Sequence, residues 1–202
     1  SAPVLARVVD ALAADGWCEM PGYLAASDAA ALREEAIARD RAGRFRPARV
    51  GRAGGAARVL AIRGDDILWL DHDDPSPAVR RALAALEALR AALNEALFLG
   101  LVELEAHLAV YPPGAGYGVH LDRFRDDDAR VVSVVLYLND AWRPEDGGCL
   151  RLYLGGAESP PVHDVAPHAG TLAVFLADRF PHEVLPARRA RYSLTGWFRR
   201  RS

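Results

Sequence analysis

Two histidines and one aspartate in the C-terminal half have the residue types and spacing of a metal site. His120 and Asp122 are separated by one residue, and His182 follows sixty residues later. Two imidazoles and one carboxylate form the facial triad that holds non-haem Fe(II) and leaves coordination positions open. Side chains two residues apart on an extended chain point to the same side. We therefore predict that His120, Asp122 and His182 bind iron.

An arginine close behind the second histidine extends this pattern. Arg191 lies nine positions after His182, in a segment rich in β-forming residues. Strand periodicity places Arg191 on one face with Ser193, Thr195 and Trp197. A buried arginine there needs an anionic partner, because an unpaired buried charge is strongly unfavourable. A two-pronged contact with the far carboxylate of a 2-oxo acid would supply it, and an internal salt bridge is the alternative.

The His-x-Asp pattern alone carries little weight, since the same chain repeats it at His72-Asp73-Asp74. We interpret His72 as a solvated residue of a polar turn, because no second histidine follows at a matching distance. A surface His-Asp pair beside an unrelated core histidine is the corresponding alternative for the predicted triad. A zinc hydrolase is a further alternative, but it would need a general-base glutamate as in His-Glu-x-x-His. Glu183 should point away from His182 across its strand.

The N-terminal half is expected to be mainly helical. Its apolar residues recur at helical spacing, and Ser76-Pro77 is typical of a helix start. Three helices are predicted, over 4–16, from Ser27 or Asp28 to about Arg41, and from Ser76 to near Gly100. Short strands are predicted at 17–23 and 67–70. The Arg- and Gly-rich segment Ala42–Ala57 is predicted to be a mobile loop.

After Gly100 the hydrophobic period changes to two, which indicates strands. Turns rich in Gly, Pro and Asp separate these strands, as in an antiparallel sandwich or barrel. We therefore expect an α+β, mostly β fold in a single domain, with helical support over about 1–100 and a β core over about 101–202. The predicted strands are 102–108, 131–138, 149–154, 171–176, 182–185 and 191–198.

Composition excludes several classes of protein. The 202 residues include 51% hydrophobic residues and carry a formal net charge of -2, so neither general nucleic-acid affinity nor a membrane span is expected. The chain contains no lysine and no glutamine, which excludes Schiff-base chemistry and a P-loop lysine. Two cysteines do not form a disulfide framework and no signal-peptide pattern is present, so we expect a cytoplasmic protein.

Along nearly its whole length the chain resembles the oxygen-sensing prolyl 4-hydroxylases, including bacterial relatives that modify a protein substrate. The resemblance depends on a long series of motifs rather than on the triad alone. These are Ile62-Arg63-Gly64-Asp65 with Trp69, Tyr111-Pro112 through Tyr117, His120-x-Asp122, Tyr137-Leu138-Asn139, Gly147-Gly148-x-Leu150-Arg151, Pro181-His182-Glu183-Val184 and Arg191-Tyr192-x-Leu194-Thr195-x-Trp197.

This resemblance implies a double-stranded β-helix, or jelly roll, supported by N-terminal helices. It also implies a dioxygenase that uses Fe(II), 2-oxoglutarate and O2, with ascorbate as activator, to hydroxylate a prolyl residue of a protein and release succinate and CO2. The implied roles are iron ligands for His120, Asp122 and His182, the 2-oxoglutarate anchor for Arg191 with Tyr137 and Thr195 nearby, cosubstrate-pocket walls for Tyr111, Leu150 and Trp197, and the base of a substrate-closing loop for Arg63 and Asp65.

The chain departs from the family in two places. The turn before His120 is one residue shorter than in the animal enzymes, and the segment from Asp122 to Arg130 is strongly charged. The first departure leaves the exact geometry of the pocket tyrosines open, and the second leaves the peptide substrate open. Two other functions therefore stay open: the same cofactors acting on a small molecule or a non-prolyl side chain, and a non-catalytic sensor of metal and 2-oxoglutarate.

Overall fold

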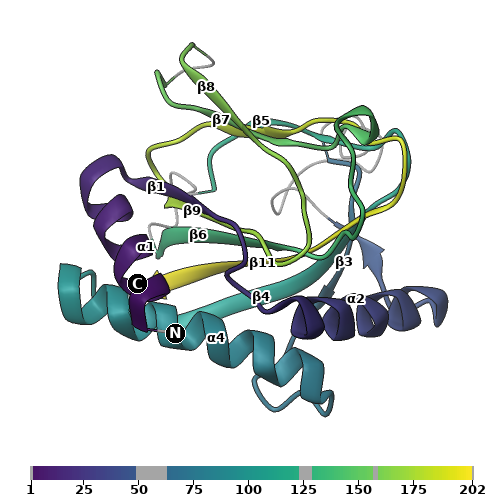
Figure 1. The fold of residues 1–202 in the computed structure, drawn as a ribbon, viewed down its shortest axis with the longest axis horizontal. Helices are drawn as coiled ribbons and strands as arrows, with labels where there is room; N and C mark the ends of the chain where they lie inside the picture. The colour runs from purple at the N-terminus through teal and green to yellow at the C-terminus, as the bar shows by residue number, and fades with distance from the viewer. Residues whose placement is uncertain (1, 49–62, 123–128, 157–158, 202) are drawn as a thin grey trace.

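Two antiparallel β-sheets face each other, and helices pack behind the larger sheet (Figure 1). The computed structural model describes residues 2–48, 63–122, 129–156 and 159–201. Helices α1, α2 and α4 lie on one side of the larger sheet, and the smaller sheet lies on the other side. This arrangement confirms the predicted α+β, mostly β class and the expected jelly roll. The division of the chain into one domain stays a prediction.

The helices begin and end close to the predicted residues. Their bounds are α1 Ala2–Asp15, α2 Ala26–Arg41 and α4 Pro77–Leu97. Helix α4 follows Ser76, with the proline at its first position. The predicted start of α2 is wrong by about two residues, because Ala25 occupies the N-cap position without a side-chain hydrogen bond. Asp28 instead lies in the first turn, where its charge favours the positive end of the helix dipole.

The larger sheet has seven strands in the order β1-β9-β6-β11-β4-β3-β2. Its centre is formed by the longest strands, which were predicted from their hydrophobic pattern. Their bounds are β1 Trp17–Met20, β9 Leu172–Leu176, β6 Arg130–Tyr137, β11 Arg191–Arg200, β4 Leu101–Tyr111, β3 Asp66–Trp69 and β2 Arg46–Pro47.

The smaller sheet has four strands in the order β5-β10-β7-β8, bounded by β5 Tyr117–His120, β10 His182–Val184, β7 Leu150–Tyr153 and β8 Val162–Val165. Strands β2, β5 and β8 were not predicted. Each is at most four residues long and lies at a sheet edge, so its hydrophobic pattern is weak.

The two faces of β11 contact two different cores. Tyr192, Leu194 and Phe198 belong to the core between the larger sheet and the helices. Arg191 and Trp197 lie on the opposite face, which confirms the predicted alternation. The space between the sheets is therefore where polar side chains of β11 meet the predicted metal ligands.

Some predictions fall outside the described residues. These include positions 49–57 of the expected loop at Ala42–Ala57 and positions 123–128 of the charged segment after Asp122. Within the described ranges, no helix is long and apolar enough to cross a membrane.

Candidate metal and cosubstrate site

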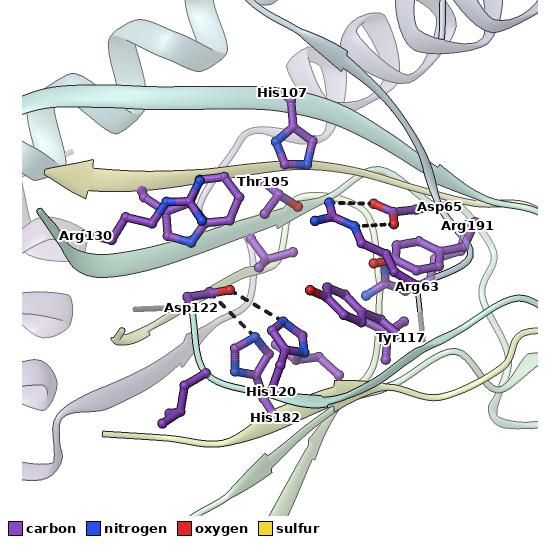
Figure 2. Close-up of a pocket in the computed structure, with 16 residues that line it drawn as sticks. Arg63, Asp65, His107, Tyr117, His120, Asp122, Arg130, His182, Arg191 and Thr195 are labelled. Carbon is purple, nitrogen blue, oxygen red and sulfur yellow. Dashed lines mark hydrogen bonds and ion pairs between the residues drawn. The ribbon is translucent and has the colours of Figure 1, made fainter. Parts of the chain in front are cut away.

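The three predicted metal ligands lie together between the sheets (Figure 2). His120 ends β5, Asp122 follows it in a bend, and His182 begins β10 directly opposite His120 in the sheet register. The Nε2 atom of His120 is 3.5 Å from Oδ1 of Asp122, and the Nε2 atom of His182 is 3.6 Å from Oδ2. One potential ligand atom from each residue lies within 4.8 Å of the other two. The strand pairing thus brings together two segments that are distant in sequence.

Backbone carbonyls set the orientation of both imidazoles. Nδ1 of His120 lies 2.8 Å from the carbonyl oxygen of Gly118, and Nδ1 of His182 lies 3.0 Å from that of Phe180. A carbonyl can only accept, so each Nδ1 carries the proton and donates. Each Nε2 then presents its lone pair toward Asp122, as metal-binding histidines do.

The electrostatics of the triad also suit a cation. Burial lowers the pKa of the His182 imidazole, which therefore stays neutral at neutral pH. Burial alone would raise the pKa of Asp122, but its two histidine neighbours and a hydrogen bond from Ser133 together hold that pKa below its usual range. A neutral imidazole and an ionised carboxylate are the forms that bind metal.

Aromatic side chains fix the positions of the two imidazole rings. The Tyr117 ring stacks on His120 with their centroids 3.6 Å apart, and Phe175 meets His182 edge-on at 4.7 Å. Because these contacts restrict both rings, the site is held in place before any ligand binds.

Arg191 occupies the other end of the same pocket. Its side chain is buried, its Nε donates to the carbonyl oxygen of Gly148 at 2.8 Å, and its guanidinium carbon lies 5.1 Å from the ring centroids of both Tyr111 and Tyr137. Among the described residues, no Asp or Glu forms an ion pair with Arg191. The predicted alternative of an internal salt bridge is therefore not seen in this part of the chain.

The surroundings of Arg191 fit a carboxylate. The buried hydroxyl of Tyr137 has no hydrogen-bond partner within the described ranges. Burial raises the pKa of Tyr137, so this hydroxyl keeps its proton and can donate. A guanidinium and a phenol, both buried and side by side, are donors that a carboxylate can accept from.

Gly148 allows the backbone to approach Arg191. Its φ is +71°, and a Cβ atom there would lie 2.8 Å from Cβ of Ala187 and 3.3 Å from Cδ of Arg191. Any larger residue would therefore strain the backbone and disturb the carbonyl that accepts from Arg191. This is the physical reason for the Gly-Gly motif before Leu150.

The remaining predicted residues line the same pocket or its edge. Arg63 donates to Asp65 in a two-pronged contact at 2.7 and 3.0 Å, and its guanidinium carbon lies 4.9 Å from the ring centroid of Tyr117. The other predicted residues that line the pocket are Tyr111, Leu150, Thr195 and Trp197. The structure thus brings all the predicted site residues except Tyr137 to the pocket surface, and the Tyr137 ring lies beside the guanidinium of Arg191.

Several lining residues were not predicted from the sequence. His107, Arg130 and Tyr117 face the pocket, and Ser133 supports Asp122 from β6. Along β4, His107 alternates with Ala106 and Leu108 of the core between the larger sheet and the helices, so its face of the strand turns into the pocket. For Ser133 a signal existed: it is a hydroxyl residue within an otherwise apolar strand, and such a buried group requires a partner.

The donor set fits Fe(II) better than a zinc hydrolase site. Glu183, the nearest candidate base in sequence, points away and accepts a hydrogen bond from the Tyr153 hydroxyl at 2.7 Å. His72 itself is exposed in a turn, as predicted, whereas Asp74 of the same pattern is buried. Two imidazoles, one carboxylate and a nearby buried guanidinium form a site that could hold both Fe(II) and a dicarboxylic 2-oxo acid.

Comparison with known proteins agrees with this chemistry. The sequence model of the 2OG-Fe(II) oxygenase superfamily matches residues 106–199. Human Egl nine homolog 1 is 33% identical over 143 residues, which are 68% of this chain and 33% of that protein. The chain spans between 20% and 62% of the length of the first curated relatives that it matches.

Solved structures extend the similarity over the whole chain. A Pseudomonas putida prolyl-4-hydroxylase is 52% identical with a TM-score of 0.87, covering 98% of this chain and 100% of that one. A Trichoplax adhaerens prolyl hydroxylase, solved in complex with a hypoxia inducible factor peptide fragment, is 30% identical with a TM-score of 0.87, covering 98% and 89%. The chain therefore belongs to the prolyl hydroxylases of the 2OG-Fe(II) oxygenase superfamily.

Proposed function

We propose that the protein is an Fe(II)- and 2-oxoglutarate-dependent dioxygenase that hydroxylates a prolyl residue in a protein or peptide and releases succinate and CO2. One observation carries the proposal: the His120, Asp122 and His182 triad shares a pocket with the buried Arg191, which has no acidic partner among the described residues. The similarity to prolyl hydroxylases supports the choice of substrate.

In this proposal the triad residues are the iron ligands. Their Nε2 atoms and the Asp122 carboxylate face one another, and their carbonyl hydrogen bonds keep the Nε2 lone pairs available. Together with 2-oxoglutarate and O2, bound iron supplies the oxidising chemistry that inserts oxygen into a C–H bond.

The protein side chains bind and orient the cosubstrate. Arg191 and Tyr137 donate to its distal carboxylate, and Thr195 lies on the same face of β11. Tyr111 and Leu150 form walls that exclude water from this end of the pocket, and Trp197 forms a wall farther along β11.

The substrate side of the pocket suits a prolyl ring. Tyr117 and Trp197 line the pocket near the triad, and Leu121 adds an apolar side chain that is 40% exposed. Arg63 and Asp65 are proposed to anchor the base of the loop that closes on the peptide. A peptide substrate is supported by the relative solved with a bound peptide fragment.

Two finer points belong to the same proposal. We propose that ascorbate activates the enzyme, because a reductant returns iron to the ferrous state after unproductive turnover. We also propose a cytoplasmic location, supported by the two free cysteines, Cys18 and Cys149.

The test is incubation of the enzyme with Fe(II), ascorbate, 2-oxoglutarate and a lysate of proline-containing proteins, followed by mass spectrometry. We expect the gain of one oxygen atom on a prolyl residue, and no gain with the His182→Ala variant. Succinate release with oxygen on another residue or on a small molecule would contradict the prolyl assignment. Binding of 2-oxoglutarate without succinate release would contradict catalysis and favour a sensor.

A further inference from the structure

A single buried hydroxyl reaches the metal site from the larger sheet. Ser133 lies in β6, where its neighbours Val132 and Val134 are completely buried, and it is itself 1% exposed. Its Oγ donates a hydrogen bond to Oδ2 of Asp122 at 2.7 Å. A hydroxyl in so apolar a strand is unfavourable unless it is hydrogen-bonded, and Asp122 is the partner it has.

The backbone around Ser133 is fixed on both sides. Strand β6 lies inside the larger sheet between β9 and β11, and Ser133 is opposite Phe175 on one and Trp197 on the other. Phe175 in turn packs edge-on against His182. The hydroxyl is therefore presented from an interior strand of the larger sheet, and one cross-strand row supports two of the three proposed metal ligands.

Asp122, by contrast, lies outside the strands, so no strand pairing fixes its backbone. It lies in a bend after the four-residue strand β5, and its carboxylate lies between the two histidines. Oδ1 is near His120 and Oδ2 is near His182, at 3.5 and 3.6 Å from their Nε2 atoms. A carboxylate in this position can bind a metal through one oxygen or through both, and binding through both would occupy an additional coordination position.

We propose that Ser133 is a positioning residue that holds the Asp122 carboxylate as a one-oxygen ligand and so keeps a coordination position free for the cosubstrate. The hydrogen bond restricts rotation of the carboxylate and engages one of its oxygens. The inference rests on the proposed role of the triad in metal binding, but not on the identity of the substrate. Loss of such a supporting contact typically weakens metal binding roughly 10–100-fold.

The test uses Co(II) as a spectroscopic probe on the metal-free protein. Ser133→Ala and Ser133→Val remove the hydroxyl. Ser133→Thr keeps the hydroxyl on a side chain that has nearly the same shape as valine. Ser193→Ala is the matched control, because Ser193 is an equally buried serine on the neighbouring strand β11, opposite Tyr137 rather than Trp197. The measurements are the Co(II) dissociation constant and the visible d–d spectrum, which reports coordination number.

We expect Ser133→Ala and Ser133→Val to bind Co(II) roughly 10–100-fold more weakly, with an altered spectrum. Ser133→Thr and Ser193→Ala should resemble the wild type. Equal affinity and spectrum in Ser133→Ala and the wild type would overturn the proposal, as would a folded Ser133→Thr variant that loses Co(II) as Ser133→Ala does. If the wild type itself bound no Co(II), the proposed triad would fail instead, so the two failures are distinguishable.

Discussion

At the scale of single residues, Arg191 is the proposed anchor of the cosubstrate in the pocket that holds the triad. Its replacement by alanine removes a buried charged hydrogen-bond donor, a loss of about 3 kcal/mol or roughly 100-fold in affinity. We expect the KM for 2-oxoglutarate to rise by about this factor in Arg191→Ala, measured as succinate release at varied cosubstrate concentration. Arg188→Ala is the control, because Arg188 is an exposed arginine in the loop between β10 and β11 that leads to Arg191. Unchanged succinate production at low 2-oxoglutarate would contradict the role of Arg191.

His107 should make stability depend on pH. Burial, together with the charges of Arg63 and Arg130, lowers its pKa to about 3, although Asp122 acts in the opposite direction. Between that value and the 6.5 of an unfolded chain, only the unfolded state binds the proton, so stability falls as the pH is lowered through this window. From pH 7 to pH 5 the loss attributable to His107 is about 2 kcal/mol.

The measurement is urea unfolding of the metal-free protein at both pH values, with His107→Leu for comparison. The variant should lose about 2 kcal/mol less than the wild type over this range. If the two proteins lost the same free energy, His107 would not be the buried neutral group described.

The sequence allowed the four side chains that define the chemistry of the site to be predicted far better than the contacts that orient them. His120, Asp122, His182 and Arg191 have side chains whose chemistry identifies them. The groups that fix the two imidazoles are carbonyls of Gly118 and Phe180, and any residue has a carbonyl. Such contacts depend on backbone geometry, which no side-chain pattern specifies.

At the scale of elements, a buried ion pair joins α2 to the turn before α4. Arg39 donates two hydrogen bonds of 2.7 Å to Asp74, and these hold the pKa of Asp74 below its usual range. Asp74→Ala leaves two guanidinium nitrogens of Arg39 without their acceptors, although Nε keeps its contact with Glu35 at 2.6 Å, so the variant should lose about 2–3 kcal/mol of unfolding free energy. Urea unfolding at neutral pH measures this loss.

A second ion pair, which joins α2 to α4 itself, is the control. Arg81 and Asp28 are 2.8 Å apart with side chains 51% and 33% exposed, so Asp28→Ala should change stability by only about 0–1 kcal/mol. Similar losses in the two variants would show that burial does not distinguish these pairs. Asp74 belongs to the His72-Asp73-Asp74 pattern, so that second His-x-Asp match has a structural role.

Long elements were predictable because many residues contribute to their pattern. Helix α4 and strand β11 each present one apolar face over at least ten residues, and both lie where expected. The four residues of β5 are too few to show a hydrophobic pattern, although this strand includes His120. Their strand conformation depends on pairing with β10, a contact between segments distant in sequence.

At the scale of the whole molecule, the proposed metal ligands connect parts of the fold that are far apart in the sequence. His120 and His182 come from neighbouring strands of the smaller sheet, while Asp122 is hydrogen-bonded to the larger sheet through Ser133. A metal that binds all three side chains binds only the folded state, because the unfolded chain does not bring them together. Its binding free energy therefore adds to the stability of the fold.

This linkage predicts a metal-dependent thermal unfolding midpoint. With free Co(II) at one hundred times its dissociation constant, the wild type should gain about 2.7 kcal/mol over the protein in chelator. For a chain of this size the midpoint should rise by roughly 5–10 °C, as measured by calorimetry. His182→Ala should remain folded but show little of this rise, since two ligands hold the metal more weakly than three. An equal rise in both proteins would place the stabilising metal elsewhere, and no rise in the wild type would mean that the triad does not hold a metal in solution.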